Sequence, residues 1–195
     1  CVKKGYANGA AEDHPLNEEE KQAMIEEAAL HYGKFLTALK CDWENDPNSM
    51  ETPKRVAKAY VNDLWAGRYN ELSGVTSFPS DGYQGIVLEK DIPVVSQCSH
   101  HHQTILGKCH IAYIPGPEGR VIGLSKLNRI VDHFGRRGAI QEQLTMAIHN
   151  AVNKVVEKNV GVVLSRSSSE FSSVEKLLSC FQNLFAKIFV RICFQ

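Results

Sequence analysis

The sequence predicts an α+β protein, in which two helices precede a core ordered strand, strand, helix, helix, strand. Three observations support this class. Helical periodicity begins at Asn17, two strand-like runs follow in the middle of the chain, and two further helical stretches precede a third apolar run. The chain has 195 residues, of which 43% are hydrophobic, and this is the composition of a globular protein.

The first predicted helix begins after Asn17, a good N-cap residue, with Glu20 at the third helical position, close to a capping-box arrangement. Its apolar residues recur at three- and four-residue spacing and predict one buried face, made of Met24, Ala28, His31, Phe35 and Leu39. Thr52 and Pro53 predict the N-cap and the first position of the second helix. This helix is expected to end at Gly67 and to bury a stripe of Val56, Tyr60 and Leu64.

The predicted core contains two strands, at residues 85–97 and 107–115, and a third at 160–164. Alternation puts Cys109, Ile111 and Tyr113 on one face of the second strand, and His110, Ala112 and Ile114 on the other. Between the second and the third of these strands lie two predicted helices, Ser125–Arg137 and Gln141–Lys158. The first is expected to face the core through Leu124, Leu127, Val131 and Phe134.

These elements suggest four parts: a mobile N-terminal arm at 1–16, a helical segment at 17–67, a core at 85–164 and an atypical tail at 165–195. Residues 68–84 are rich in Ser, Gly and Pro and predict a long connection. The tail is first polar and then apolar at helical spacing, through Phe171, Val174, Leu178, Phe181, Phe185 and Ile188. No further strand is predicted there.

The composition excludes several classes of function. Twenty-two basic residues balance twenty-two acidic ones, so the net charge gives no sign of a nucleic-acid or anionic-membrane partner. No apolar run approaches the ~18 residues of a membrane span. The six cysteines are irregularly spaced in a chain that is not small, which favours a reducing compartment and a cytoplasmic location.

One short stretch, "SQCSHHHQT" at 96–104, holds a cysteine and three consecutive histidines. Thiolate and imidazole are the ligands that zinc prefers, so Cys98 and His101 are candidate metal ligands, provided that the chain turns between them. The alternatives are a buried small hydrophobe and a hydrogen-bonded core imidazole. His100 is a candidate acid–base group, because an unperturbed imidazole titrates near neutral pH; the alternative is a surface histidine. His102 is expected to be the most dispensable of the three.

A second group of candidates lies in "GLSKLNRIVDHFGRRG". Ser125 and Lys126 are at a predicted helix start, where free N–H groups and the helix dipole favour anions. Lys126 and Arg129 share a helix face, with Arg136 and Arg137 further along. This cluster suits a polyphosphate, and its alternative is a solvated basic face. In "QEQLT", the Glu142 carboxylate suits paired N–H donors such as a guanine edge, or it merely complements the helix dipole.

Taken together, these motifs resemble the type I GTP cyclohydrolase family. The resemblance rests on "SQCSHHHQTILGKCHIAYIP", on "VIGLSKLNRIVDHFGRRGAIQEQLT" and on the upstream "TPKRVAKAY", and it runs from about residue 18 to 164. It implies a tunnelling fold, an antiparallel sheet with two helices on one face, assembled as a homo-oligomer, usually a decamer of two pentamers with active sites between subunits. The implied reaction opens the purine ring of GTP, releases formate and gives 7,8-dihydroneopterin triphosphate, the first step of tetrahydrofolate and pterin biosynthesis.

The resemblance also assigns roles to residues. It makes Cys98 and His101 two of three zinc ligands and His100 the acid–base histidine. It places Ser125, Lys126 and Arg129 near the triphosphate, and Gln141 and Glu142 on the guanine.

The sequence departs from the family in three places. Ser99 replaces a usual glutamate between the ligands, and Thr104-Ile105 replaces a usual Pro-Phe. After residue 164 the family continues with a His-x-Cys element, an arginine and a last strand, whereas residues 165–195 contain no histidine. Cys180 or Cys193 could replace the missing ligand. We expect a foreign or frame-altered C-terminus, such as that of a splice variant. A transcript that confirms these codons in frame, together with accumulation of the protein, would reject this explanation of the tail. We also expect little activity for this chain.

Two other functions stay open at this stage. The chain could be a non-catalytic paralogue that joins active rings and alters their regulation. It could also be a different tunnelling-fold enzyme, the queuosine-pathway nitrile reductase, but that chemistry needs a nucleophilic cysteine rather than a zinc pair.

Overall fold

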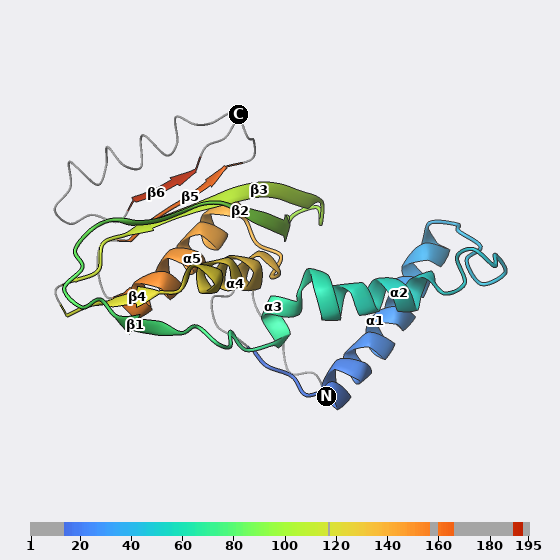
Figure 1. Ribbon diagram of the computed structural model, residues 1–195. Coiled ribbons are helices and arrows are strands. Elements are labelled where there is room, and N and C mark those ends of the chain that lie inside the picture. The colour runs from blue at the N-terminus through green and yellow to red at the C-terminus, as the bar shows by residue number, and fades with distance from the viewer. Residues whose placement is uncertain (1–13, 117, 157–159, 166–188, 193–195) are drawn as a thin grey trace.

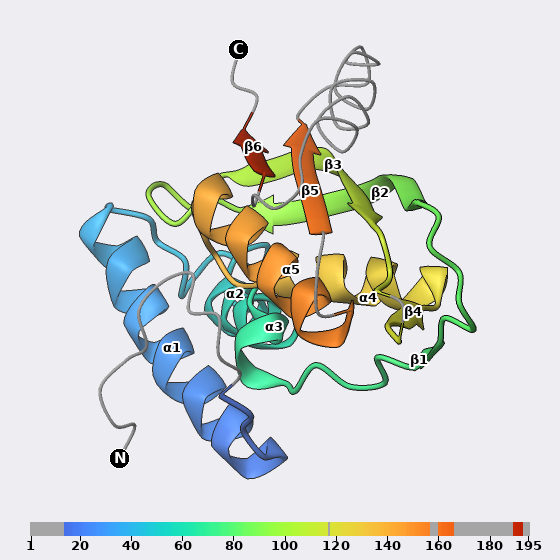
Figure 2. The ribbon, with the colours of Figure 1, turned by 90° about the vertical axis from the view of Figure 1, so that its left-hand side faces the viewer.

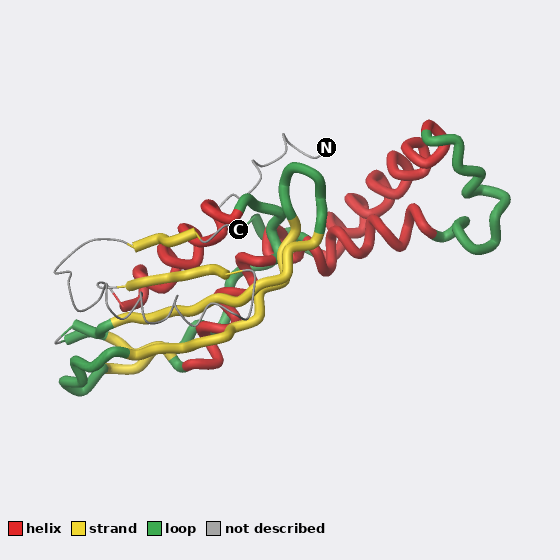
Figure 3. The backbone as a smooth tube through the Cα atoms, turned by 90° about the horizontal axis from the view of Figure 1, so that it is seen from above, coloured by secondary structure: helices red, strands yellow, loops and turns green. Residues whose placement is uncertain are grey.

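The computed structural model of the chain describes residues 14–116, 118–156, 160–165 and 189–192 (Figure 1). It has two parts. A helical hairpin, Glu18–Tyr69, extends away from a body made of strands and two long helices. Seen from above, the strands lie together in the body while the first two helices point outward from one end of it (Figure 3).

The first helix, α1 (Glu18–Ala38), begins as predicted. The Glu20 backbone N–H donates to Asn17 Oδ1 at 2.8 Å, and the Asn17 N–H donates to Glu20 Oε2 at 2.9 Å. This reciprocal capping box satisfies two of the N–H groups that a helix leaves open at its start. Just before it, the His14 and Leu16 N–H groups donate to the carbonyls of Arg68 and Tyr69, both at 3.0 Å. The rest of the predicted N-terminal arm lies outside the described residues.

The predicted buried face of α1 is wrong in its second half. Phe35 and Leu39 are 54% and 58% exposed, and His31 is exposed as well. The buried positions are Ile25 and Gly33 instead, and the indole of Trp43 covers Gly33. The reason is that α1 packs on a single partner helix, which covers a narrower stripe than the apolar spacing of the sequence offers.

The second arm of the hairpin is α2 (Thr52–Ala59), which continues into a π-helical turn, η1 (Tyr60–Leu64), and a short helix, α3 (Ala66–Tyr69). Thr52 is the first helical residue rather than the N-cap, which is Glu51. Gly67 does not end the helical segment. Its N–H donates to the Arg136 carbonyl at 3.0 Å, and a Cβ there would lie 1.9 Å from the His133 carbonyl oxygen. Gly67 is therefore the point where the hairpin meets the body.

The main sheet has the strand order β2-β3-β5-β6, with bounds β2 Val87–Gln97, β3 Thr104–Tyr113, β5 Val160–Ser165 and β6 Phe189–Ile192. The three predicted strands are confirmed, and β2, β3 and β5 pair antiparallel in that order. The tail does contain a strand, contrary to prediction: β6 pairs with β5, and the pairing is parallel, so the sheet is not antiparallel throughout. The helical spacing at 171–188 lies outside the described residues.

Two further strands were not predicted. β1 (Ser77–Pro79) and β4 (Arg120–Ile122) form a separate antiparallel pair. Each has three residues, which is too short for a recognisable alternation. The first of them lies within the predicted connection at 68–84.

Two helices, α4 (Leu124–Gly135) and α5 (Gln141–Val156), lie on one face of the sheet (Figure 2). They bury the main hydrophobic core against it, which includes Ile111, Leu127, Ile130, Ile148 and Val162, all fully buried. Leu127, Val131 and Phe134 face this core as predicted, but Leu124 is 51% exposed because it is the first residue of α4. In the described part of the chain, no helix is long and apolar enough to cross a membrane.

Candidate functional site

The candidate metal residues lie on the connection between β2 and β3, which we call the histidine loop (Cys98–Gln103). The chain turns sharply here, as a metal pair three residues apart requires. The Cys98 N–H donates to the Gln103 carbonyl and the His102 N–H donates to the Cys98 carbonyl, both at 2.9 Å. His102 has a φ of +54°, in the left-handed region that non-glycine residues rarely adopt. The loop is thus closed by its own backbone.

The side chains of this loop differ in exposure. Cys98 is a half-buried free thiol, whereas His100 and His101 are exposed. The centroids of the His100 and His101 rings are 6.4 Å apart, with the ring planes at 75°. Both imidazoles are therefore accessible from outside, and neither is a buried core imidazole.

The donor types fit zinc, but the donor count does not reach a complete site. A thiolate and an imidazole are suitable zinc ligands, and a catalytic site takes three protein ligands. Among the described residues, no group of three or more His, Cys, Asp or Glu side chains is arranged to hold a metal ion. Cys180 and Cys193, the predicted substitutes, lie outside the described residues.

A second cysteine, Cys109, is a useful contrast. It lies on β3 in the main core and is fully buried. Burial raises the pKa of the Cys109 thiol far above its ordinary value, because a thiolate loses its hydration there. Cys109 is thus a packing residue, and of these two thiols Cys98 is the more accessible.

The histidine loop lies beside the start of α5. Cys98 forms a β-bridge with Ala139, and the Ala139 N–H donates to the Gln97 carbonyl at 3.2 Å. Gln141, the first residue of α5, is only two positions further on. The structure thus brings the candidate metal loop and the candidate guanine-binding pair to one end of the sheet.

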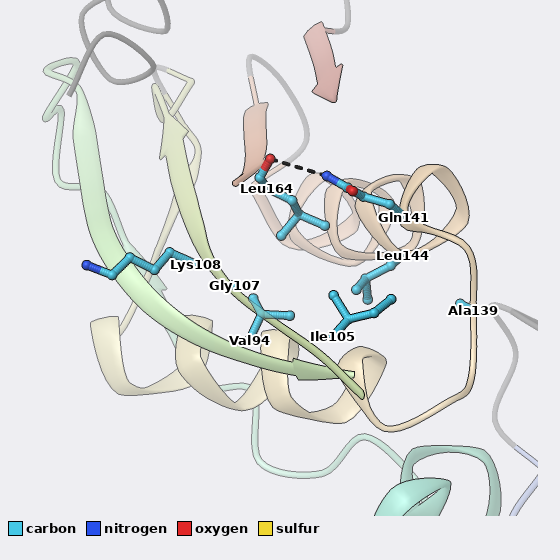
Figure 4. Close-up of a pocket in the computed structure, with 8 residues that line it drawn as sticks. All are labelled: Val94, Ile105, Gly107, Lys108, Ala139, Gln141, Leu144 and Leu164. Atoms are coloured by element: carbon cyan, nitrogen blue, oxygen red, sulfur yellow. Dashed lines mark hydrogen bonds between the residues drawn. The ribbon is translucent and has the colours of Figure 1, made fainter. Parts of the chain in front are cut away.

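Gln141 lines a pocket whose walls are otherwise mostly apolar (Figure 4). Its amide nitrogen donates to the Leu164 carbonyl at 3.4 Å, so the side chain is held across the pocket toward β5. Glu142 is exposed in the first turn of α5 and does not line this pocket. The lining residues are Val94, Ile105, Gly107, Lys108, Ala139, Gln141, Leu144 and Leu164.

The candidate phosphate residues lie elsewhere. Ser125 and Arg129 are exposed and Lys126 is half-buried, all in the first half of α4. The N-cap is Gly123, which has no side chain to satisfy the open N–H groups of the first turn. From Ser125 to Gly135 the helix rises about 15 Å, and its far end abuts the Val95 carbonyl of β2, where a Cβ on Gly135 would lie 2.9 Å away. Within one chain, the basic cluster therefore lies in the half of α4 that is further from the histidine loop.

The two arginines that follow α4 form contacts with other residues of the chain. Arg136 Nε donates to Asp132 Oδ1 at 2.9 Å, and its Nη1 contacts Asp63 Oδ1 of η1. The hydrogen bond with Asp132 is the main reason why the pKa of Arg136 is raised. Arg137 is 2% exposed, lies over the Phe134 ring at 4.5 Å and contacts His133 Nε2 at 2.6 Å. Neither guanidinium extends the exposed basic cluster.

The sequence missed four residues that hold the histidine loop from behind. We call them the Trp65 cluster: Tyr60, Trp65, Gln97 and His102. They join β2 and the loop to η1 through hydrogen bonds and ring contacts. His102, expected to be the most dispensable of the three histidines, thus contacts Tyr60, Trp65 and Gln97. No local pattern points to it, because its ring partners, Tyr60 and Trp65, lie some forty positions away in the sequence.

The fold and this site define an α+β protein with a Cys/His loop at one end of its sheet, next to a helix start that lines a pocket. The model of the family "GTP cyclohydrolase I" matches residues 28–170, and the chain belongs to this family. Curated proteins named GTP cyclohydrolase 1, from Brucella suis, Brucella abortus and Brucella canis, are 44% identical over 119 residues, which are 59% of this chain and 54% of each relative. The chain thus spans about half the length of the curated relatives it matches.

Proposed function

We propose that this chain is a zinc-dependent GTP cyclohydrolase I that opens the purine ring of GTP, releases formate and gives 7,8-dihydroneopterin triphosphate for pterin biosynthesis. We propose further that it adopts the tunnelling fold and that its turnover is impaired. The observation that carries the proposal is the bridge between Cys98 and Ala139. It joins the two motifs that the chemistry needs side by side, a metal pair and a guanine-binding helix start.

Each residue has a distinct task in this proposal. Cys98 and His101 would hold the zinc ion, which when bound supplies a Lewis acid that activates water near neutral pH. His100, exposed next to His101, would move protons to and from the purine. Gln141 and Glu142 would bind the guanine edge with amide and carboxylate groups, which together match its donors and acceptors.

The triphosphate is assigned to Ser125, Lys126 and Arg129. These residues offer a helix start, an ammonium group and a guanidinium group, which suit a polyanion. Along α4, Ser125 lies about 15 Å and Arg129 about 9 Å from the end of that helix near the histidine loop. This separation favours a site shared between two copies of the chain, in which one copy supplies the loop and the other the basic cluster. It supports the proposal of a homo-oligomer.

Impairment follows from the donor count. A zinc ion held by two protein ligands binds more weakly than one held by three, and the described residues supply only Cys98 and His101. The decisive experiment measures zinc content and dihydroneopterin triphosphate fluorescence on the purified chain, beside a version with a family-typical tail. We expect less than one zinc per chain and slow turnover, and both should rise with the replaced tail. One zinc per chain with robust formate release would overturn the impairment.

Variants of the histidine loop test the assignment itself. In the version with a family-typical tail, His100→Gln should lower formate release by about a hundredfold or more, because general acid–base catalysis contributes at least that factor. Zinc content should not change. His31→Gln, on the exposed face of α1, is the matched control and should leave both unchanged. An unchanged rate in His100→Gln would reject the role of His100.

A second candidate function is a non-catalytic subunit that joins active rings of an intact paralogue. The incomplete donor set in the described residues favours it. Co-expression with an intact family member distinguishes the two: stable mixed rings, together with no activity of this chain alone, would favour the subunit role.

A further inference from the structure

The histidine loop contacts the helical hairpin through the Trp65 cluster. We propose that this cluster is a positioning device, which fixes the conformation of the loop and so sets Cys98 and His101 for metal binding. The inference about metal rests on the proposed function, but the fixed loop conformation can be tested without any metal.

Gln97 is the centre of the hydrogen bonds. Trp65 Nε1 donates to Gln97 Oε1 at 2.7 Å. The amide nitrogen of Gln97, Nε2, donates two hydrogen bonds, to the His102 carbonyl at 3.1 Å and to the Tyr60 hydroxyl at 3.3 Å. Gln97 is 5% exposed, so the loss of any partner leaves a buried polar group unsatisfied. The amide thus links the residue before Cys98 to the residue that closes the loop.

The rings add a second set of contacts. The centroid of the His102 imidazole lies 5.4 Å from that of the Trp65 ring and 5.9 Å from that of the Tyr60 ring. The His102 Nδ1 atom lies 3.2 Å from the Tyr60 hydroxyl. Tyr60 and Trp65 also pack edge to face at 5.0 Å. These contacts hold His102 in its left-handed conformation, which costs free energy for a residue with a Cβ.

The π-helical turn explains why Tyr60 and Trp65 can both reach the loop. The Trp65 N–H donates to the Tyr60 carbonyl at 2.9 Å, five residues back, as in a π-helix. In an α-helix, residues five apart point about 140° away from each other. The wider turn brings them onto one side. Such turns occur often at functional sites.

Trp65 also contacts the segment between α4 and α5. Gly138 has a φ of +64°, and a Cβ there would lie 2.6 Å from Trp65 Nε1. The next residue, Ala139, is the bridge partner of Cys98. The Trp65 indole therefore contacts both Gln97, the residue before Cys98, and Gly138, the residue before the bridge partner of Cys98. Loss of the indole should weaken both of these supports of the histidine loop.

The test compares the two tryptophans of the full chain. Trp65→Phe removes the N–H that donates to Gln97. Trp43→Phe is the matched control, because Trp43 Nε1 also donates one hydrogen bond, to Thr37 Oγ1 at 3.1 Å, far from the loop. The readout is the rate of Cys98 alkylation by iodoacetamide, resolved by peptide mass spectrometry and divided by the rate at the exposed Cys41.

We expect the Cys98/Cys41 rate ratio to rise about fivefold in Trp65→Phe, the factor that corresponds to one hydrogen bond of average strength. It should stay at the wild-type value in Trp43→Phe. Gln97→Leu should raise the ratio too, and adding Trp65→Phe to it should raise it less than Trp65→Phe does alone, because the two residues act through one contact. A ratio unchanged by Trp65→Phe, or raised equally by Trp43→Phe, would overturn the proposal.

A cobalt titration separates this inference from the proposed function. Trp65 is the only tryptophan in Trp43→Phe, so its emission should respond when Co²⁺ binds at the histidine loop, and Trp65→Phe should bind Co²⁺ about tenfold more weakly. If no variant binds Co²⁺ while the alkylation ratio still rises in Trp65→Phe, the metal part of the proposed function fails and the positioning role of the cluster stands.

Discussion

The body and the helical hairpin differ greatly in the size of their hydrophobic cores. Among the described residues, the body has a core cluster of nineteen buried residues, most of them from the sheet, α4 and α5, whereas the hairpin has a cluster of four: Ile25, Ala57, Val61 and Tyr69. Fewer buried apolar residues mean less buried apolar area, and with it less hydrophobic free energy. Yet the weaker part supplies Tyr60 and Trp65, which hold the histidine loop. The candidate site therefore depends on the less stable region of the chain.

The first prediction measures the two clusters directly. Ile111→Ala, in the body, should lower the free energy of unfolding by about 4 kcal/mol, because the site is fully buried and cannot collapse. Ile25→Ala, in the hairpin, should cost about 2 kcal/mol, because solvent lies close to the smaller cluster. Urea unfolding monitored by circular dichroism gives both values. Equal losses of unfolding free energy in the two variants would show that the two clusters do not differ in the way proposed.

The second prediction breaks the junction between the two parts. Gly67→Ala should cost about 3 kcal/mol, because the new Cβ would lie 1.9 Å from one backbone carbonyl oxygen and 3.0 Å from another. Hydrogen exchange should show lost protection in the hairpin and retained protection in the body. Gly123→Ala is the control, since the nearest atom to its Cβ is a flexible lysine carbon at 3.7 Å. Protection lost equally in both parts would show that they unfold together.

The third prediction concerns the hairpin alone. Asn17→Ala removes the capping box of α1 and should lower the stability of the hairpin by about 1 kcal/mol. Asn17→Ser keeps a capping oxygen and should recover most of this loss. Hydrogen exchange along α1 is the measurement, and identical protection in both variants would show that the cap is not needed.

The smallest expected effect belongs to the body and depends on pH. Burial lowers the pKa of His110 below its ordinary value of 6.5, the nearby Lys108 and Lys90 lower it further, and Asp91 opposes them. The Asp91 N–H also donates to His110 Nδ1 at 3.2 Å, which requires the neutral ring. Because the unfolded chain then binds a proton more readily, stability is full above pH 6.5 and is lost as the pH falls below it.

His110→Asn keeps an acceptor for the Asp91 N–H but does not titrate. The stability of the wild type relative to the variant, measured by urea unfolding from pH 7.5 to 5.5, should decrease as the pH falls, because only the wild type takes up a proton at this position on unfolding. A constant difference across this range would exclude His110 as a source of pH dependence.

The sequence predicted those elements whose signals are local. The capping box of α1 lies within four residues, and each predicted core strand or helix follows its own periodicity. Two features depend on partners far along the chain and were missed or wrong. The exposed Phe35 and Leu39 depend on which helix α1 meets, and the parallel β6 depends on the path of the tail.

The candidate site divides in the same way. The motifs at Cys98, Ser125 and Gln141 were visible because each is compact. The Trp65 cluster was not, because the hydrogen bonds that join Tyr60 and Trp65 to Gln97 and His102 link positions 32 to 42 residues apart. Arg136 seemed available for a ligand until the structure paired it with Asp63, 73 positions away.

The π-turn at Tyr60–Leu64 has a consequence for how this protein can vary in length. Deleting one residue there would let an ordinary α-helix form, with better local hydrogen bonding, and would leave four residues from Tyr60 to Trp65 in place of five. Residues four apart in an α-helix point only about 40° away from each other, so Trp65 would still face Gln97, and Gly67 would still face the Arg136 carbonyl. A homologue that is shorter by one residue between Pro53 and Gly67 should therefore keep the indole and lack only the π-turn.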